Sequence, residues 1–268
     1  MTVRLAIANQ KGGVGKTTTA ISLGSALAKR GQRVLLVDLD PQANATSGLG
    51  LPKDSPLSVY QTLLDGVGIN DVVQRTSVGN LDIVPSSLAM AGAEVELVPT
   101  MAREARLRDG LGPIGSRYDL VLIDCPPSLG LLTINALVAC SHLLIPLQCE
   151  YFALEGLAQL IAAVDLVQER LNPDLRIFGV LMTMEDRRNR LTQQVVDDVR
   201  RHFRKELFRT RIPRSVRLAE APSHGRSVDE YRPDSSGAQA YGDLAREVIR
   251  RLRAEAAIPI ASARAASG

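Results

Sequence analysis

The sequence feature that most constrains the fold is a glycine-rich stretch from Asn9 to Thr19, which reads Asn-Gln-Lys-Gly-Gly-Val-Gly-Lys-Thr-Thr-Thr. It follows an apolar run at residues 3–8 and precedes a pattern typical of a helix. Glycines let the backbone approach an anion closely, and the first turn of the next helix adds the positive end of its dipole. Lys16 can neutralise phosphate charge, and Thr17 offers a hydroxyl to Mg²⁺. The stretch therefore predicts a phosphate-binding loop between a strand and a helix.

The loop departs from the ordinary pattern GxxxxGK[ST], because Gln10 stands where that pattern has its first glycine. What stands instead is KGGxGKT, with an additional Lys11 before the glycines. This variant resembles the deviant Walker A motif of the ParA/MinD group of P-loop ATPases. The resemblance implies that Lys11 acts across a dimer interface on the nucleotide of the partner, and that a β-branched side chain at Gly13 would obstruct this approach. The nucleotide-binding residues that it implies are Lys11, Gly12, Gly13, Val14, Gly15, Lys16, Thr17 and Thr18.

Strands alternate with helices through almost the whole chain. Beyond the loop, apolar patterns predict strands at 34–37, 81–84, 118–123, 142–147, 175–184 and 207–212. Helices are expected at 17–30, 57–64, 94–111 (charged and exposed), 129–139, 154–171, 191–205 and 239–255, with a loop at 43–56. The alternation favours an α/β fold, a doubly wound and mostly parallel sheet flanked by helices, in one domain over residues 1–257. The small residues of 258–268 predict a disordered tail.

Three aspartates end predicted strands. Asp124 follows the strand at 118–123, where a Walker B carboxylate would hold Mg²⁺ directly or through water, although capping the next helix is an alternative role. The resemblance places Asp40 in the first switch of the family and Cys-Pro-Pro-Ser at 125–128 in the second. Asp38 is expected either to fix the loop and waters near the metal or to be only a buried, hydrogen-bonded carboxylate. Because the carboxyl ends of parallel strands meet at one edge of a sheet, these groups should converge on the loop.

The reaction implied by these residues is attack of water on Mg·ATP, giving ADP and phosphate. A carboxylate near the γ-phosphate can orient or partly deprotonate that water, and Asp40 is the predicted group. Lys11, Lys16 and Asp40 are therefore the expected catalytic residues. The expected metal ligands are Thr17, Asp40 and Asp124.

The composition narrows the class of protein. The chain has 268 residues, 45% of them hydrophobic and 23% charged, which is ordinary for a globular protein in water. Aromatic residues make up only 3%, with no Trp, which argues against a stacking platform for bases. Apolar runs are strand-sized and the N-terminus enters a strand directly, so neither a membrane span nor a signal peptide is expected. Cys125, Cys140 and Cys149 form no CxxC pair and are expected to be buried thiols in a reducing cytoplasm.

The net charge of +3 hides an asymmetry. Residues 187–217 hold eleven Lys/Arg against three acids, a local charge of +8 that leaves −5 elsewhere. Such a basic region suggests a polyanionic partner, although a solvated basic helix is the alternative interpretation. In the family, short ParA proteins bind DNA without sequence preference when ATP dimerises them. By position in the motifs, Arg188 and Arg217 are the first predicted DNA contacts. Arg187 and Arg190 are predicted beside them, with Arg200, Arg201 and Arg204 in support.

The resemblance extends over nearly the whole chain and is strongest to the short chromosome-partitioning ParA (Soj) type. It includes Glu150-Tyr151-Phe152-Ala153-Leu154-Glu155-Gly156 and the run from Ile212 to Pro222. It implies that Met184, Pro213, Arg214 and Ser215 flank adenine, although the family often has Asn at the position of Ser215. It also implies an ATP-dependent homodimer, non-specific double-stranded DNA, a ParB-like activator, and a cytoplasmic, nucleoid-associated location without stable membrane binding.

Four alternative interpretations make different demands on the sequence. A glycine-rich turn with surface lysines would need no nucleotide. A MinD-like membrane ATPase should end in an amphipathic helix with bulky apolar residues, whereas 250–268 ends in small residues. A relative of the nitrogenase iron protein would need cysteine ligands, and Cys125 and Cys140 do not stand at those positions. A synthetase on the same fold would need a substrate pocket for which the sequence has no motif.

Overall fold

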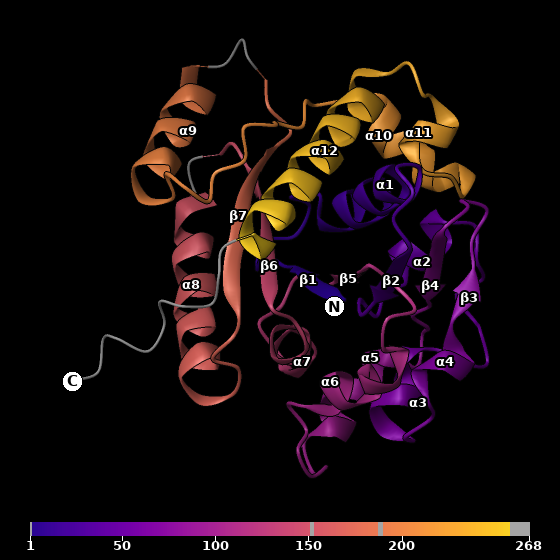
Figure 1. The fold of residues 1–268 in the computed structure, drawn as a ribbon. Coiled ribbons are helices and arrows are strands. Elements are labelled where there is room, and N and C mark those ends of the chain that lie inside the picture. The colour runs from indigo at the N-terminus through magenta and orange to yellow at the C-terminus, as the bar shows by residue number, and fades with distance from the viewer. Residues whose placement is uncertain (1, 151–152, 187–189, 258–268) are drawn as a thin grey trace.

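The computed structural model describes residues 2–150, 153–186 and 190–257 and contains one seven-stranded sheet (Figure 1). The strand order is β3-β4-β2-β5-β1-β6-β7. Neighbouring strands are parallel except for the antiparallel pair β3–β4 at one edge. The strands are β1 (Val3–Ile7), β2 (Val34–Asp38), β3 (Gln74–Arg75), β4 (Leu81–Val84), β5 (Leu120–Asp124), β6 (His142–Gln148) and β7 (Arg176–Thr183). The predicted doubly wound, mostly parallel sheet is confirmed.

Helices cover both faces of the sheet (Figure 1). One face packs against α1 (Lys16–Ala28), α2 (Asn44–Gly48), α10 (Val216–Glu220), the 3₁₀ turn η2 (Ala221–His224), α11 (Val228–Tyr231) and α12 (Ser236–Ala256). The other packs against α3 (Val59–Leu64), α4 (Ile69–Val72), α5 (Met90–Leu97), α6 (Arg106–Gly110), the 3₁₀ turn η1 (Gly112–Ile114), α7 (Leu131–Ala139), α8 (Ala153–Arg170) and α9 (Arg190–His202). None of these described helices is both long and apolar enough to cross a bilayer.

Alternation along the strands produces the two cores. In β1, Leu5 and Ile7 belong to the core under α1 and α12, whereas Ala6 belongs to the core on the opposite face. All three side chains are at most 1% exposed. A strand buried on both faces reads as a continuous apolar run, which is why residues 3–8 gave a clear strand signal.

Glycines flank the helix that follows the loop. Gly15 caps α1 with a left-handed φ of 88°, and Gly31 ends the turn that follows it with a φ of 81°. A residue with a Cβ rarely adopts this conformation, so each glycine sets a boundary. The predicted inner face of this helix, Ala20, Leu23 and Leu27, is fully buried.

The predicted exposed helix at 94–111 is wrong. The chain forms α5 and α6 instead, separated by turns, with Ala102 at a φ of 51°. Leu97, Leu107 and Leu111 are fully buried. The many charged residues of this segment hid its apolar pattern. Because the segment folds into two short helices, leucines of both helices can pack in the core against the sheet.

The predicted strand at 207–212 is also wrong, because only Leu207 bridges β7. The amides of Phe208 and Ile212 donate to carbonyls of β7, at Val180 and Met182. Between them, the amides of Arg209 and Thr210 donate to the carboxylate of Glu247 on α12, at 3.0 and 2.9 Å. A continuous ladder cannot form where these amides turn away from the sheet. The predicted loop at 43–56 likewise contains a short helix, α2.

Glu247 is therefore a structural carboxylate. Burial alone would raise its pKa, but hydrogen bonds from Arg209, Thr210 and Arg251 lower it below the ordinary value. Because the folded-state pKa is depressed, this stabilisation is present above the unfolded pKa of about 4.3 and is lost as pH falls through the folded value.

We expect Glu247→Gln to lower the free energy of unfolding by roughly 2–4 kcal/mol at pH 7, because it leaves Arg251 without its charged partner. Urea unfolding at pH 7 and at about pH 3.5 would measure this. The gap between wild type and variant should narrow in acid, and an equal gap at both pH values would contradict the assignment. Asp243→Asn, an exposed change one turn away on α12, is the control.

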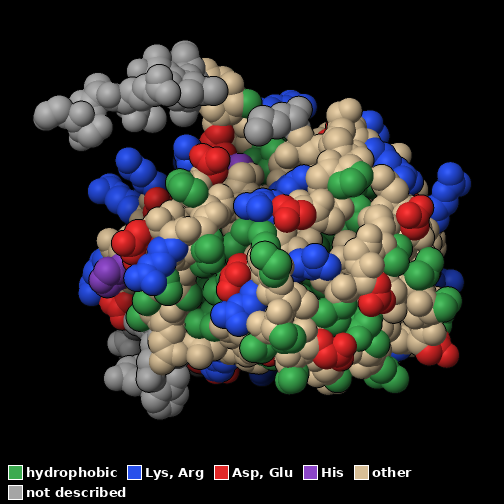
Figure 2. All heavy atoms as spheres, turned by 90° about the horizontal axis from the view of Figure 1, so that it is seen from below, with side chains coloured by type: hydrophobic (Ala, Val, Ile, Leu, Met, Phe, Trp, Pro, Cys, Tyr) green, Lys and Arg blue, Asp and Glu red, His purple; other side chains and the backbone are tan. Residues whose placement is uncertain are grey.

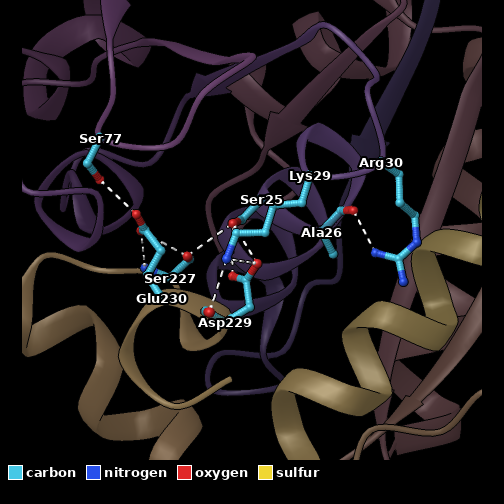
Figure 3. Close-up of polar contacts among 8 residues, drawn as sticks. All are labelled: Ser25, Ala26, Lys29, Arg30, Ser77, Ser227, Asp229 and Glu230. Atoms are coloured by element: carbon cyan, nitrogen blue, oxygen red, sulfur yellow. Dashed lines mark hydrogen bonds and ion pairs between the residues drawn. The ribbon is translucent and has the colours of Figure 1, made fainter. Parts of the chain in front are cut away.

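Residues 216–231 form short helices that the sequence pattern did not predict. Side-chain contacts fasten α11 to α1 (Figure 3): the Ser25 hydroxyl donates to Asp229 at 2.8 Å, and the Lys29 ammonium lies 2.8 Å from the same carboxylate. Ser227 caps α11 in a capping box with Glu230. Contacts between residues two hundred positions apart leave no local periodicity to detect.

Candidate nucleotide site

The phosphate-loop candidate and the aspartates meet at the carboxyl edge of the sheet. The parallel registers pair Asp124 at the end of β5 with Ile7 of β1 on one side and with Asp38 of β2 on the other. The loop leaves β1 directly after Ile7. The predicted convergence of the loop with Asp38, Asp40 and Asp124 is confirmed.

The loop is held from both ends. The Asn9 side-chain amide donates to the carbonyl of Pro146 on β6 at 2.7 Å, and its oxygen accepts from the Lys11 amide at 3.0 Å. Further along the loop, the Thr183 hydroxyl at the end of β7 donates to the Val14 carbonyl at 2.8 Å. The loop is thus anchored by β6 and β7, which lie on the other side of β1 from Asp124.

Two lysines of the loop have different surroundings. Lys16 is only 6% exposed, and its ammonium donates to the carbonyl of Lys11 at 3.1 Å across the loop. Burial lowers the pKa of Lys16, while Asp124 and Asp40 oppose that shift. Lys11 is more exposed, and its ammonium forms an ion pair of 2.5 Å with Glu150, which follows β6. Lys16 thus faces the interior of the site and Lys11 its rim.

The glycines of the loop leave free space. A Cβ added to Gly12, Gly13 or Gly15 would meet nothing within 4 Å, but Gly13 has a φ of 75° that a side chain would strain. The single chain therefore gives no steric reason for Gly13 beyond its backbone conformation. The predicted obstruction by a larger residue stays a prediction about a dimer.

The first two aspartates differ in their hydrogen bonding. Asp38 is fully buried and accepts from the Thr46 amide and hydroxyl at 2.8 and 2.7 Å and from the Asp40 amide at 3.1 Å. Asp40 is 7% exposed and accepts from the Gln42 amide at 2.9 Å. These contacts fit the second of the two roles expected for Asp38, a buried carboxylate that shapes the turn carrying Asp40.

Asp124 is the unusual member of the group. Both of its carboxylate oxygens are buried, and within the described chain neither has a hydrogen-bond partner of standard geometry. Burial raises the pKa of Asp124 well above its ordinary value, the charge of Asp38 adds to the shift, and the nearby Thr17 and Lys16 oppose it. Burial likewise raises the pKa of Asp38 to about 6. A bound cation would favour the ionised forms of these buried carboxylates, and the free oxygens of Asp124 could serve as its ligands.

The donor set fits Mg²⁺ bound together with a nucleotide. Mg²⁺ takes hard oxygen ligands and is usually held by one or two protein groups plus phosphate oxygens and water. In the described part of the chain, no three His, Cys, Asp or Glu side chains are arranged to hold a metal by themselves. Thr17 and Asp124 could supply protein oxygens, with Asp40 near them, and phosphates would supply others.

A pocket of about 200 Å³ adjoins the loop. Gly15 and Thr18 form its loop side, and its mostly apolar lining includes Leu218 and Tyr241. The four residues predicted to flank adenine all line this pocket, although none adjoins the loop in sequence: they are Met184, Pro213, Arg214 and Ser215. A flat apolar base fits such a pocket better than a charged group does.

Comparisons with known proteins show which family the chain belongs to. Residues 2–177 match a family model described as an AAA domain. The sporulation initiation inhibitor protein Soj of Bacillus subtilis (strain 168) is 56% identical over 245 residues, which is 91% of this chain and 97% of that protein. The chain belongs to the ParA/MinD family, Soj type. The chromosome partitioning protein ParA of Myxococcus xanthus is 51% identical over 92% of this chain and 88% of its own length.

Solved structures agree with this ParA/MinD assignment. Cobyrinic acid a,c-diamide synthase from Mycobacterium smegmatis, with bound ADP and magnesium, has a TM-score of 0.84 and 39% identity over 95% of this chain and 97% of that one. The septum site-determining protein MinD of Pyrococcus horikoshii, complexed with Mg-ADP, has a TM-score of 0.77 and 25% identity over 96% of this chain and all of that one. The P-loop ATPase fold and the family are therefore shown.

The predicted DNA contacts of this ParA/MinD chain are only partly visible. Arg187 and Arg188 lie outside the described residues, and Arg190 begins α9 with a side chain that is not described. Arg217 on α10 is exposed and pairs with Glu220 at 2.7 Å. Arg217 precedes Leu218, which helps to line the pocket beside the loop, so the structure brings Arg217 near that pocket.

Sequence reasoning missed several residues that build this ParA/MinD-type site. Glu150 pairs with Lys11, Thr183 anchors Val14, and the Tyr241 hydroxyl lies 3.0 Å from that of Thr19 in the buried contact of α12 with α1. The Ser86 hydroxyl donates to the carbonyl of Asp40 at 2.7 Å. These partners lie between 46 and 222 positions apart, so no local spacing could reveal them.

Proposed function

We propose that the chain is a DNA-partitioning ATPase in which ATP forms a sandwich dimer, the dimer binds duplex DNA without sequence preference, and hydrolysis stimulated by a ParB-like partner releases it. The observation that carries the proposal is the different placement of the two loop lysines. Lys16 is buried against its own loop, whereas Lys11 stands at the rim, where a second copy could meet it. The relatives named as chromosome partitioning proteins support the same function.

In this proposal each residue of the site has a defined task. The loop amides and Lys16 hold the β- and γ-phosphates of ATP, and the pocket beside Met184 and Pro213 takes adenine. Thr17 and Asp124 would hold Mg²⁺, with Asp40 close by. When bound, Mg²⁺ neutralises charge on the phosphate oxygens.

Hydrolysis proceeds by attack of water on the γ-phosphorus. Asp40 orients this water and accepts its proton as the new P–O bond forms, and the bond from the γ-phosphorus to the bridging oxygen breaks to leave ADP. Lys16, and Lys11 from the partner, stabilise the charge that develops on the phosphate oxygens. Lys11 can serve the partner only after it leaves Glu150. That exposed ion pair is weak enough to exchange, since such pairs contribute about 0–1 kcal/mol.

DNA binding would follow from dimerisation. Arg187, Arg188, Arg190 and Arg217 are the proposed phosphate contacts, and two copies double their number. Linking two weak sites raises their combined affinity without any new contact, which explains why DNA binding would depend on ATP.

Co-sedimentation with DNA in the presence of ATP, ADP or no nucleotide tests the function. We expect the wild type to pellet with DNA only with ATP, and Arg217→Ala to weaken binding about tenfold at low salt. Arg108→Ala, an exposed arginine on α6, is the matched control. DNA binding that ignores ATP would refute the proposal, and ATP-dependent pelleting with anionic vesicles instead of DNA would favour a MinD-like membrane protein.

A further inference from the structure

A basic groove lies away from the nucleotide site, between the end of α9 and the C-terminal half of α12. It has a volume of about 880 Å³, and seven of its ten lining residues are Lys or Arg while one, Glu247, is acidic. Figure 1 shows α9 and α12 flanking β7, the edge strand of the sheet. By contrast, the face drawn in Figure 2 mixes basic and acidic side chains closely.

The residues at the floor of the groove contact one another. The Arg251 guanidinium donates to the carbonyls of Glu206 and Leu207 at 3.0 and 2.8 Å and to Glu247 at 2.9 Å. The same group lies 3.9 Å from the ring centroid of Phe208. The charge of Arg251 is thus used inside the fold, and the single acid of the groove is neutralised by it.

Unlike Arg251, the cations at the rim of the groove are not neutralised by acidic side chains of the described residues. Arg204, Lys205, Arg209 and Arg250 are all exposed, and in the described chain none of them forms an ion pair with an acidic side chain. They come from three segments, the turn after α9, the stretch before Pro213, and α12. Like charges placed together repel one another, so an unneutralised rim of this kind favours an anionic ligand.

The side chains that line the groove favour one kind of polyanion over others. A membrane-binding surface needs exposed apolar side chains beside its cations, and none of the large hydrophobic residues exposed in the described chain lines this groove. A single-stranded nucleic acid needs exposed aromatic rings for stacking, but Phe208 is only 1% exposed. A phosphodiester backbone in a duplex needs only cations along a concave path.

We infer that this groove is a second contact surface for the backbone of duplex DNA, with Arg204, Lys205, Arg209 and Arg250 binding its phosphates. The inference rests on the proposed function and adds a surface to it that is separate from Arg217. It places part of the DNA contact on α12, outside the basic stretch at 187–217. Because the rim reads charge alone, it contributes affinity without sequence preference.

The test is the salt dependence of duplex DNA binding by the full chain with ATP and Mg²⁺. Binding is measured by fluorescence anisotropy with a labelled duplex of about 30 base pairs, which is long enough to cover several phosphate contacts. The variant is Arg209→Gln with Arg250→Gln. Neither side chain holds the floor, since Arg209 contacts Glu247 only through its amide. The matched control is Arg75→Gln with Arg232→Gln, which removes the same charge from exposed positions on β3 and beside α11.

We expect the groove variant to bind at least about tenfold more weakly at roughly 100 mM salt, and the slope of log K against log salt to fall by about one for each phosphate that the variant no longer binds. Thermal unfolding and ATP-dependent dimerisation should match wild type. If the groove variant bound DNA with the same affinity and salt slope as the control variant, the inference would be overturned. It would also be overturned if the groove variant lost binding to anionic vesicles while its DNA binding stayed intact.

The same experiment separates the groove from the proposed function. If the wild type itself ignored DNA, the proposed function would fail together with the groove. A wild type that binds normally, a weakened Arg217→Ala and an unaffected groove variant would reject the groove alone.

Discussion

Replacing Asp40 by alanine is expected to keep ATP binding and dimerisation and to lower turnover by about 10²-fold or more. Asp40 is nearly buried at the carboxyl edge of the sheet, and its backbone is fixed by Asp38 and Ser86. The carboxylate itself accepts a hydrogen bond from the Gln42 amide and keeps further acceptor capacity to orient water. Release of phosphate under single-turnover conditions, together with binding of a fluorescent ATP analogue, measures the two effects separately.

Asp38→Asn is the matched control for Asp40→Ala. Asp38 holds the Thr46 amide and hydroxyl in the core, so its replacement should lower the free energy of unfolding by about 1–3 kcal/mol. Turnover by the fraction that remains folded should fall much less than in Asp40→Ala. Full hydrolysis by Asp40→Ala would remove Asp40 from the catalytic role.

Replacing Lys11 by alanine is expected to preserve nucleotide binding within a few-fold while DNA binding with ATP falls to the level seen with ADP. Within its own chain Lys11 contributes an exposed ion pair with Glu150, and such pairs contribute little. The proposed effect of Lys11 lies in the partner's site. Loss of its side chain should therefore uncouple DNA binding from ATP binding and leave the fold unchanged. Filter binding of labelled ATP and co-sedimentation with DNA give the two measurements.

Glu150→Gln is the control for that experiment. It removes the same ion pair but keeps the ammonium of Lys11, so ATP-dependent DNA binding should survive. If both variants lost DNA binding equally, the ion pair within one chain would be the important interaction and the action of Lys11 across an interface would be refuted.

The parts of the fold that the sequence predicts well are those with strong local patterns. The strand at 3–8, the glycine loop and the helix after it follow from apolar runs and from glycines that require a left-handed conformation, at Gly15 and Gly31. Asp124 was predictable because it ends such a run. The sheet class followed from the alternation of these units.

The errors come from contacts that are distant in sequence. The segment at 207–212 has strand-like residues, but Glu247 on α12 captures two of its amides and ends the ladder. The segment at 94–111 has helical residues, but burial of its leucines under the sheet splits it in two. In the site, Lys11 pairs with Glu150, and the buried oxygens of Asp124 have no hydrogen-bond partner of standard geometry among the described residues. Both features depend on the assembled sheet edge, so only the structure could show them.

The measurement that tests the account most directly is the mass of the wild-type chain in solution with a non-hydrolysable ATP analogue and Mg²⁺. Sedimentation equilibrium should give 28.9 kDa without nucleotide or with ADP and twice that mass with the analogue. Lys11→Ala should stay at the monomer mass even with the analogue bound. A wild type that binds the analogue and remains a monomer at concentrations well above those used for DNA binding would contradict the central claim that ATP joins two copies through this loop.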